Sequence, residues 1–394
     1  MSKFIPLSVP NFEGNEQKYV NDAVEQGWVS TGGAYITKLE KDLADFLHTD
    51  NVAACQSGTS ALHLALVSCG IQPGDMVMVP TVTFIAAVNP VKYQFAEPVF
   101  MDCDNSLCID PVKVRKFCVE ECEVRDNILI HKKTGKKVKA LVVVHVFGNI
   151  ADMEAIMELA EKFNFKVIED STEALGSYYT EGKYKGKYAG TIGDYGAYSF
   201  NGNKIITTGG GGAITANNSA EVDHLRYLST QAKDDPHYYI HNEIGFNYRM
   251  TNLQAALGVA QVEKVPEFID RKNKNFDLYQ NLFAGFKFGK LMPFRKGTYS
   301  NKWFYSLLID RNKIKNSMRD IITQLEKNNI GTRAIWGLIH EQKPYAGSLV
   351  YEMEKAPYYS NCIINIPCST NLTDEDINYV AHTIMSVLEA MADE

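Results

Sequence analysis

Long apolar runs are missing from the sequence, and none approaches the roughly 20 residues that a helix needs to cross a bilayer. The first ten residues, MSKFIPLSVP, contain neither a signal-peptide core nor an acylation motif. A basic excess is missing too, because 47 aspartates and glutamates outnumber 40 lysines and arginines, giving a net charge of −7. We therefore expect no membrane anchor and no nucleic-acid partner.

Cysteine is sparse, with eight residues in a chain of 394. Cys118 and Cys122 lie four positions apart, and no second pair repeats that spacing, so the pattern does not indicate a zinc site. We expect no metal, reduced thiols and a cytoplasmic location. The composition is otherwise that of a globular protein, with 45% hydrophobic and 22% charged residues, enough for two domains with substantial cores.

From residue 51 onward, short apolar strands alternate with helices. The predicted strands cover residues 52–55, 76–79, 98–101, 140–144 and 166–169, and the predicted helices cover 61–69 and 151–163. Such alternation is typical of a mostly parallel sheet with helices on both faces. The expected fold class is therefore α/β.

The chain divides into an N-terminal arm and two domains. We expect an extended arm at 1–12, a large domain at 13–255 with a hairpin-like insertion at about 123–139, and a small C-terminal α/β domain at 256–394. A helix at 252–262 is expected to link the two domains. The small domain should contain strands at 303–309, 331–336 and 363–366, and a capping box at Thr373 should open the last helix.

Lys204 is the first candidate for chemistry. It lies in a turn between two strand-like segments and is followed by four consecutive glycines, residues 209–212, which leave room for a flat partner. A lysine amine can form a Schiff base, most readily where its surroundings keep it deprotonated. Taken alone, the pattern is more often that of a solvated loop lysine followed by a flexible glycine run.

Other candidates follow strands of the expected sheet. Gly58 and Thr59 lie where a strand gives way to a helix, and a helix N-terminus suits a phosphate, although many ordinary helix starts look the same. Asp170 ends an apolar strand, where a carboxylate can pair with a pyridine nitrogen. Phe84 follows another strand and could stack on a flat ring, and Asn247 is a polar loop residue.

The order of these motifs resembles the DegT/DnrJ/EryC1/StrS sugar aminotransferases, which have the aspartate-aminotransferase (type I) fold. The likeness runs from about residue 6 to the C-terminus. The residues that carry it are Ser57-Gly58-Thr59-Ser60-Ala61-Leu62, Thr83-Phe84, His145-Val146-Phe147-Gly148-Asn149, Glu169-Asp170, Gly193-Asp194, Tyr198-Ser199-Phe200 leading to Lys204, Gly211-Gly212 and Asn247-Tyr248-Arg249-Met250-Thr251-Asn252.

The resemblance implies a pyridoxal 5′-phosphate (PLP) enzyme that alternates with the pyridoxamine form (PMP). Lys204 would hold PLP and then act as a base, and Asp170 would pair with the pyridinium nitrogen. Phe84 would stack on the ring. The phosphate would be bound by Gly58, Thr59 and Ser199, and by Asn247 of the partner subunit, so the resemblance also implies a homodimer with shared sites.

Two positions depart from the family pattern. Many members carry Gln three residues after the aspartate, facing the cofactor's phenolic oxygen, but this sequence has Glu173 there. Its carboxyl group could be protonated or could change the proton balance of the cofactor. Many members also carry Gly-Glu-Gly-Gly where residues 209–212 are all glycine. A subset of dehydratases replaces the lysine by histidine, and Lys204 argues against that activity.

Within the family, the sequence is most similar to the branch that aminates UDP-linked 4-keto-6-deoxy-N-acetylhexosamines for bacillosamine and legionaminic acid synthesis. The resemblance implies amine transfer from L-glutamate to C4 of such a sugar, for bacterial surface glycans. The alternatives are a GDP-linked sugar of perosamine type, a dTDP-linked 3-keto sugar, or a non-catalytic regulator. Candidate substrate contacts are Ser30, Lys233, His237, Tyr238, Arg249, Arg333 and His340.

Overall fold

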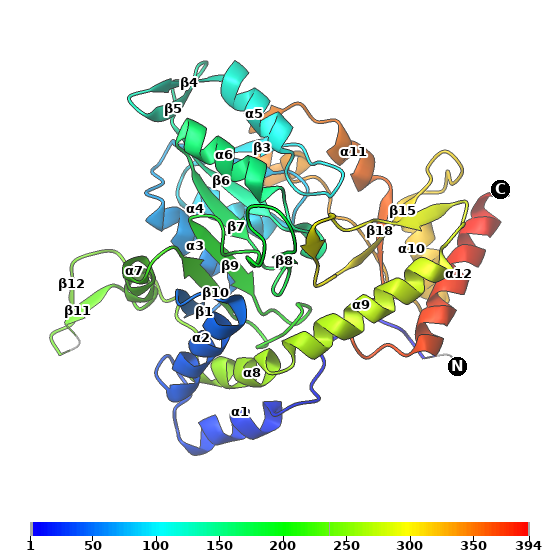
Figure 1. Cartoon of the computed structure of the whole chain (residues 1–394), viewed down its shortest axis with the longest axis horizontal. Coiled ribbons are helices and arrows are strands. Elements are labelled where there is room, and N and C mark those ends of the chain that lie inside the picture. Colours follow the sequence, from blue (N-terminus) through cyan, green and yellow to red (C-terminus); the bar gives the residue numbers. More distant parts are fainter. Residues whose placement is uncertain (1–2, 236, 393–394) are drawn as a thin grey trace.

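An eight-stranded sheet forms the centre of the computed structural model, which describes residues 3–235 and 237–392 (Figure 1). In chain order its strands are β1 (Val52–Cys55), β2 (Met76–Pro80), β3 (Glu97–Met101), β6 (Val138–Val144), β7 (Lys166–Asp170), β9 (Tyr195–Ser199), β10 (Gly212–Ala216) and β17 (Leu349–Tyr351). Their spatial order is β1-β10-β9-β7-β6-β2-β3-β17. Only β10 runs against its neighbours, so the expected mostly parallel sheet is confirmed.

Helices cover both faces of this sheet, as strand β1 illustrates. Val52 and Ala54 belong to one buried cluster, together with α2 (Ala34–Leu47) and α8 (Asn252–Val262). Ala53 and Cys55 belong to the other, together with α3 (Gly58–Ser68). Successive side chains of a strand point to opposite faces, so a short, fully apolar strand serves two layers of helices at once.

Helix α3 begins three residues earlier than the sequence pattern indicates. Ser57 caps it, because the Ser57 Oγ accepts a hydrogen bond from the Ser60 N–H at 3.0 Å. Gly58 and Thr59 therefore belong to the first helical turn rather than to the loop before it. The backbone N–H groups of a first turn have no partner within the helix, so they point outward from the end of β1.

The remaining elements of the first 262 residues surround the sheet. They are helices α1 (Glu16–Glu25), α4 (Asn89–Tyr93), α5 (Pro111–Glu120), α6 (Met153–Phe163) and α7 (Ser219–Ser229), short 3₁₀ turns η1 (Ile85–Ala87) and η2 (Val146–Gly148), and strands β4 (Cys122–Arg125), β5 (Ile128–His131), β8 (Tyr178–Tyr179), β11 (Lys233–Asp235) and β12 (Ile240–His241). Strands β4 and β5 pair as an antiparallel hairpin at the start of the segment proposed as an insertion. Across the described residues, no helix combines the length and apolarity that a membrane span requires.

A second sheet lies in the C-terminal part of the chain. This part of the chain contains helices α9 (Val265–Leu282), α10 (Met318–Lys327), α11 (Lys355–Ser360) and α12 (Asp374–Ala392), and 3₁₀ turns η3 (Ile339–Glu341) and η4 (Lys343–Tyr345). Its strands are β13 (Gly289–Leu291), β14 (Thr298–Tyr299), β15 (Tyr305–Ile309), β16 (Arg333–Ala334) and β18 (Ile363–Ile366), of which β14 pairs with β8. The sheet order is β13-β15-β18-β16. Strand β16 is shorter than the strand expected at 331–336.

The link between the two sheets is α9 rather than α8. Helix α8 packs against α1 and α2, whereas α9 runs from there to the C-terminal helix α12 (Figure 1). The expectation of a linking helix at 252–262 was wrong, because the apolar side chains of α8 are buried against the first part of the chain. The boundary proposed after residue 255 falls inside this helix and stays a prediction.

The N-terminal arm lies against the C-terminal part. The Ile5 N–H donates to the Asn329 carbonyl at 2.8 Å, and the Gly331 N–H donates to the Ile5 carbonyl at 2.8 Å. Two residues later, the Leu7 carbonyl accepts from the Cys368 N–H at 2.8 Å. The arm therefore connects the C-terminal part of the molecule to α1.

Candidate active site

A cavity of about 750 Å³ opens at the carboxyl ends of β1, β7 and β9. These three strands run in the same direction, so their ends meet at one edge of the sheet, where open α/β sheets bind ligands. Its lining includes Gly58, Thr59, Phe84, Asp170, Glu173, Ser199, Lys204, Trp303 and Arg333. The N-terminal arm and β16 contribute to the same wall, so both parts of the molecule enclose the space.

The Lys204 amine is largely shielded from solvent, with a side chain 13% exposed. Its Nζ lies 3.9 Å from the Glu173 Oε1 and 4.2 Å from the centre of the Trp303 ring. Burial lowers the pKa of Lys204, and the charges of Glu173 and Asp170 oppose that effect. A shielded amine whose charged form is disfavoured has the properties of a nucleophile or base.

Two buried carboxyl groups face this amine. Burial raises the pKa of Glu173 to about 7, although its Oε2 accepts a hydrogen bond from the Phe147 N–H at 2.7 Å. Burial also raises the pKa of Asp170, whose Oδ1 accepts from the Thr172 N–H at 3.1 Å. A cationic partner in the cavity would favour the charged form of each carboxylate.

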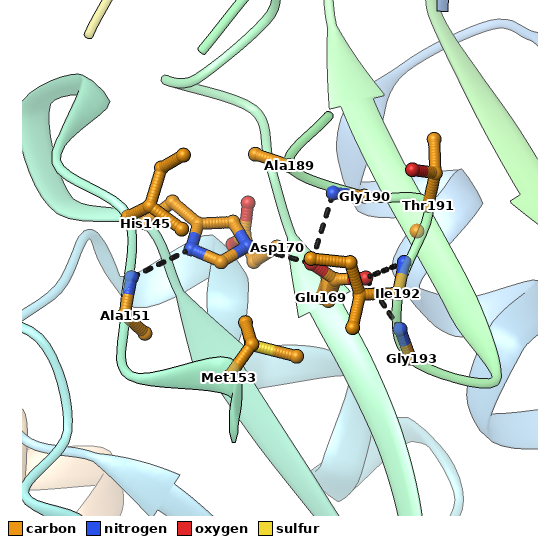
Figure 2. Close-up of polar contacts among 12 residues, drawn as sticks. His145, Ala151, Met153, Glu169, Asp170, Ala189, Gly190, Thr191, Ile192 and Gly193 are labelled. Atoms are coloured by element: carbon orange, nitrogen blue, oxygen red, sulfur yellow. Dashed lines mark hydrogen bonds and ion pairs between the residues drawn. The ribbon is translucent and has the colours of Figure 1, made fainter. Parts of the chain in front are cut away.

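The residue before Asp170 is fixed by an unusually complete set of hydrogen bonds (Figure 2). The Glu169 Oε2 accepts from Gly190 N–H at 2.9 Å, and its Oε1 accepts from the N–H groups of Ile192 and Gly193 at 2.7 and 2.6 Å. The fourth contact is to His145, whose Nε2 lies 2.9 Å from the Glu169 Oε2. Four donors compensate one fully buried carboxylate.

The backbone determines the protonation pattern of His145. The Ala151 N–H points at the His145 Nδ1 at 3.1 Å, so Nδ1 is the acceptor and Nε2 carries the hydrogen that it donates to Glu169 (Figure 2). The pair therefore consists of a neutral imidazole and an anionic carboxylate. Because Asp170 follows Glu169 directly in β7, this network fixes the end of the strand that presents Asp170 to the cavity.

Gly58 and Ser199 form a tight corner at the start of α3. A Cβ atom added to Gly58 would lie 2.8 Å from the Ser199 Cβ and 2.9 Å from the Thr172 Cγ2. Only glycine permits this approach, which brings the Ser199 side chain to the helix N-terminus. Backbone N–H groups, a helix dipole and a hydroxyl converge there, an arrangement suited to a phosphate.

Of three basic residues predicted to contact substrates, one lines the cavity and two do not. Arg333 lines the cavity from β16. Arg249 instead forms an ion pair with Glu40 and donates to the Ala54 carbonyl at 3.2 Å. The His340 Nδ1 lies 2.6 Å from the Thr81 Oγ1, outside the lining.

The remaining candidates are exposed and do not line the cavity of their own chain. They are Ser30, Lys233, His237, Tyr238 and Asn247. Lys233 and Tyr238 belong to the β11–β12 segment, which projects from the body of the molecule (Figure 1). Asn247 accepts a hydrogen bond from the Gln231 Nε2 at 3.2 Å.

The family model for the DegT/DnrJ/EryC1/StrS aminotransferase family matches residues 10–385. The chain belongs to this family. It is 36% identical over 389 residues to the GDP-perosamine synthase of Escherichia coli O157:H7, an alignment that covers 97% of this chain and 98% of that protein. It is 26% identical over 364 residues to the UDP-4-amino-4,6-dideoxy-N-acetyl-beta-L-altrosamine transaminase of Campylobacter jejuni, covering 92% of each.

The fold is that of PLP-dependent aminotransferases. The sugar aminotransferase Spr1654 from Streptococcus pneumoniae, solved in its PLP form, superposes with a TM-score of 0.86 at 23% identity, over 98% of this chain and 99% of that chain. This family of transaminases uses PLP, and the cavity fits it. A shielded lysine, a buried aspartate and a glycine corner at a helix N-terminus match the aldehyde, ring nitrogen and phosphate of PLP.

Several residues of this site had no role in the prediction from sequence. Trp303 comes from the C-terminal part and lies against the Lys204 amine. His145 and Glu169 belong to matched motifs, but their pairing depends on the sheet placing β6 beside β7. In the sequence, the pair is indicated only by the positions of His145 and Glu169 at the ends of apolar, strand-like segments.

Replacing Glu169 by Ala should leave the His145 N–H and three backbone N–H groups without their acceptor. We expect the free energy of unfolding to fall by at least about 3 kcal/mol, because each buried donor left without an acceptor costs about 1–3 kcal/mol. Urea unfolding at neutral pH measures this loss. Glu158→Ala, on the exposed side of α6, is the control and should stay within about 0.5 kcal/mol of the wild type. Equal midpoints for Glu169→Ala and wild type would contradict the assigned network.

Gly58→Ala should weaken PLP binding, because the new methyl group crowds the Ser199 and Thr172 side chains at the phosphate corner. Alanine is the better helix former by about 1 kcal/mol, so a loss of affinity cannot come from helix propensity. Equilibrium dialysis with PLP measures the effect. Gly202→Ala is the matched control, since a Cβ atom there meets nothing within 4 Å. Equal affinity for both variants would remove the steric argument.

Proposed function

We propose that this protein transfers an amino group from L-glutamate to C4 of a nucleotide-linked 4-keto-6-deoxy sugar. The observation that carries the proposal is the convergence of Lys204, Asp170 and the Gly58 corner on one cavity. When bound, PLP supplies a ring that withdraws electrons from the substrate carbon and carries the amino group between the two substrates.

In this proposal, Lys204 binds the cofactor and afterwards moves a proton to or from the substrate carbon. Burial lowers the pKa of Lys204, which favours the first task, and the two carboxyl groups stabilise the charged amine that forms when Lys204 takes up a proton. Asp170 keeps a proton on the ring nitrogen, Phe84 packs on the ring, and Glu173 lies near the cofactor. The role of Phe84 is supported by its position, because it lines the cavity and 55% of its surface is exposed.

Gly58, Thr59 and Ser199 hold the phosphate in this proposal. The first turn of α3 offers backbone N–H groups, and the Ser199 side chain lies at the same corner. This leaves Arg333 for the substrates, since Lys204 and Arg333 are the only lysine and arginine among the described residues that line the cavity. A guanidinium suits both a carboxylate of glutamate and a diphosphate.

A GDP-linked sugar is the first candidate for the amino acceptor. The 36% identity to a GDP-perosamine synthase extends over nearly the whole of both chains, and it favours the perosamine type of substrate over the UDP-linked sugar expected from the sequence. A UDP-linked 4-keto-6-deoxy-N-acetylhexosamine is the second candidate. It is supported by the sequence motifs and by the weaker likeness to the altrosamine transaminase.

A homodimer with shared sites completes the proposal. Asn247 lies outside the cavity of its own chain, so it can serve a phosphate only in a neighbouring subunit. The β11–β12 segment and the loop after it support this, because Tyr238, Tyr239 and Ile244 are 80%, 70% and 88% exposed in one chain. Exposed apolar residues of this density mark an interaction surface. Lys233, His237 and Tyr238 would then reach the substrate of the partner.

The purified protein should be yellow and should aminate one keto sugar of a panel with glutamate as donor, seen as a mass shift of the sugar nucleotide. The panel contains GDP-linked and UDP-linked 4-keto-6-deoxy sugars and a dTDP-linked 3-keto sugar. Lys204→Ala should lose at least about 10²-fold in rate, the lower range for loss of a general base. Wild-type turnover in that variant, or no product from any sugar, would end the proposal.

Subunit mixing tests the shared site. Lys204→Ala and Asn247→Asp should each be inactive, the second because a carboxylate would repel the phosphate. Random exchange of subunits makes half of the dimers mixed, and each mixed dimer holds one intact site. The mixture should therefore recover about a quarter of the wild-type activity. No recovery, with exchange shown by mass spectrometry, would mean that each chain builds its own site.

A further inference from the structure

Glu173 has one oxygen committed and one oxygen directed at the active-site amine. Its Oε2 accepts the Phe147 N–H at 2.7 Å, which fixes the orientation of the carboxyl group. Its Oε1 lies 3.9 Å from the Lys204 Nζ. At this distance the two groups form an ion pair rather than a hydrogen bond, and a small movement of the lysine side chain would bring them into contact.

Trp303 also lies close to the amine. The Lys204 Nζ lies 4.2 Å from the centre of the indole ring, whose face attracts a cation. The indole N–H donates to the Asn203 carbonyl at 2.7 Å, so the ring is tied to the residue next to the lysine. The amine therefore lies near both an aromatic face and a carboxyl group, and both favour its protonated form.

Within the described residues, Asp170 is the other charged group that acts on this pair. Lys204 and Asp170 are the charged groups that act on Glu173, and Glu173 and Asp170 are those that act on Lys204. Glu173 is 3% exposed, so water does not compensate its charge. Burial disfavours the charged form of both groups, and one proton placed between them relieves both penalties.

We propose that Glu173 and Lys204 share one proton, and that Glu173 exchanges this proton with the lysine while Lys204 moves protons to and from the substrate. In the exchange, one N–H bond of the ammonium breaks and one O–H bond forms at the Glu173 Oε1. The reverse step restores the ion pair, and nothing is oxidised or reduced. The proposal rests on the role proposed above for Lys204.

The carboxyl group is essential to this proposal. Glutamine, which many family members carry at this position, has nearly the same shape and can still accept the Phe147 N–H. Its amide cannot take up a proton near neutral pH. Glu173→Gln therefore removes the proton exchange and keeps the packing.

The first test measures Lys204 without turnover. The full chain, freed of PLP, is labelled with acetic anhydride over a range of pH, and the Lys204 peptide is quantified by mass spectrometry. Loss of the neighbouring carboxylate should lower the midpoint of labelling by about 1–3 pH units in Glu173→Gln. Below both midpoints, the variant should then label about 10- to 1,000-fold faster than the wild type.

Glu158→Gln is the matched control, since it removes a carboxylate from an exposed position on α6. Its labelling midpoint should equal that of the wild type. Equal midpoints in Glu173→Gln and wild type would overturn the shared proton. They would leave the proposed function intact, because that is judged separately by product formation.

The second test follows the half-reaction with glutamate through the change in cofactor absorbance. Glu173→Gln should slow this step by about 10²-fold, the lower range for loss of a proton-transfer group. PLP affinity, measured in parallel, should fall much less. A wild-type rate in Glu173→Gln would overturn the exchange, even if the labelling midpoint had moved.

Discussion

The removal of one amine from water is the constraint on which the rest of the site depends. A lysine side chain that is 13% exposed must either lose its proton or find compensating charges, and the carboxyl groups of Asp170 and Glu173 provide them. These carboxyl groups are buried as well, so each group of the site affects the ionisation of the others. The Glu169 network then holds the end of β7 in place behind this cluster.

Much of the fold could be predicted from the sequence, because short apolar segments bounded by polar residues carry a clear signal. The bounds expected for β1, α8 and β18 agree with the structure. The start of α3 was missed because a serine cap moved it upstream. The path between the two sheets was missed because it depends on what the apolar faces of α8 and α9 pack against. These partners are distant in the sequence, so the local pattern of residues does not indicate them.

More of the residues proposed to bind the cofactor than of those proposed to bind substrates line the cavity. Lys204, Asp170 and Ser199 lie at strand ends or in the turn beside them, where motif order is informative, and all three line the cavity. Arg249 was proposed for its charge, but its ion pair with Glu40 arises from residues 209 positions apart. Distant pairings of this kind, like the position of Trp303, exist only in the folded chain.

Strand β17 has a consequence for movement within the molecule. It leaves the C-terminal part and adds itself to the edge of the central sheet beside β3, while the N-terminal arm and α9 join the same two parts elsewhere. Several separate segments thus tie the halves of the cavity together. A hinge that opened the cavity would have to bend all of these connections together, so we expect ligands to enter through local shifts at the rim rather than by a swing of one half away from the other.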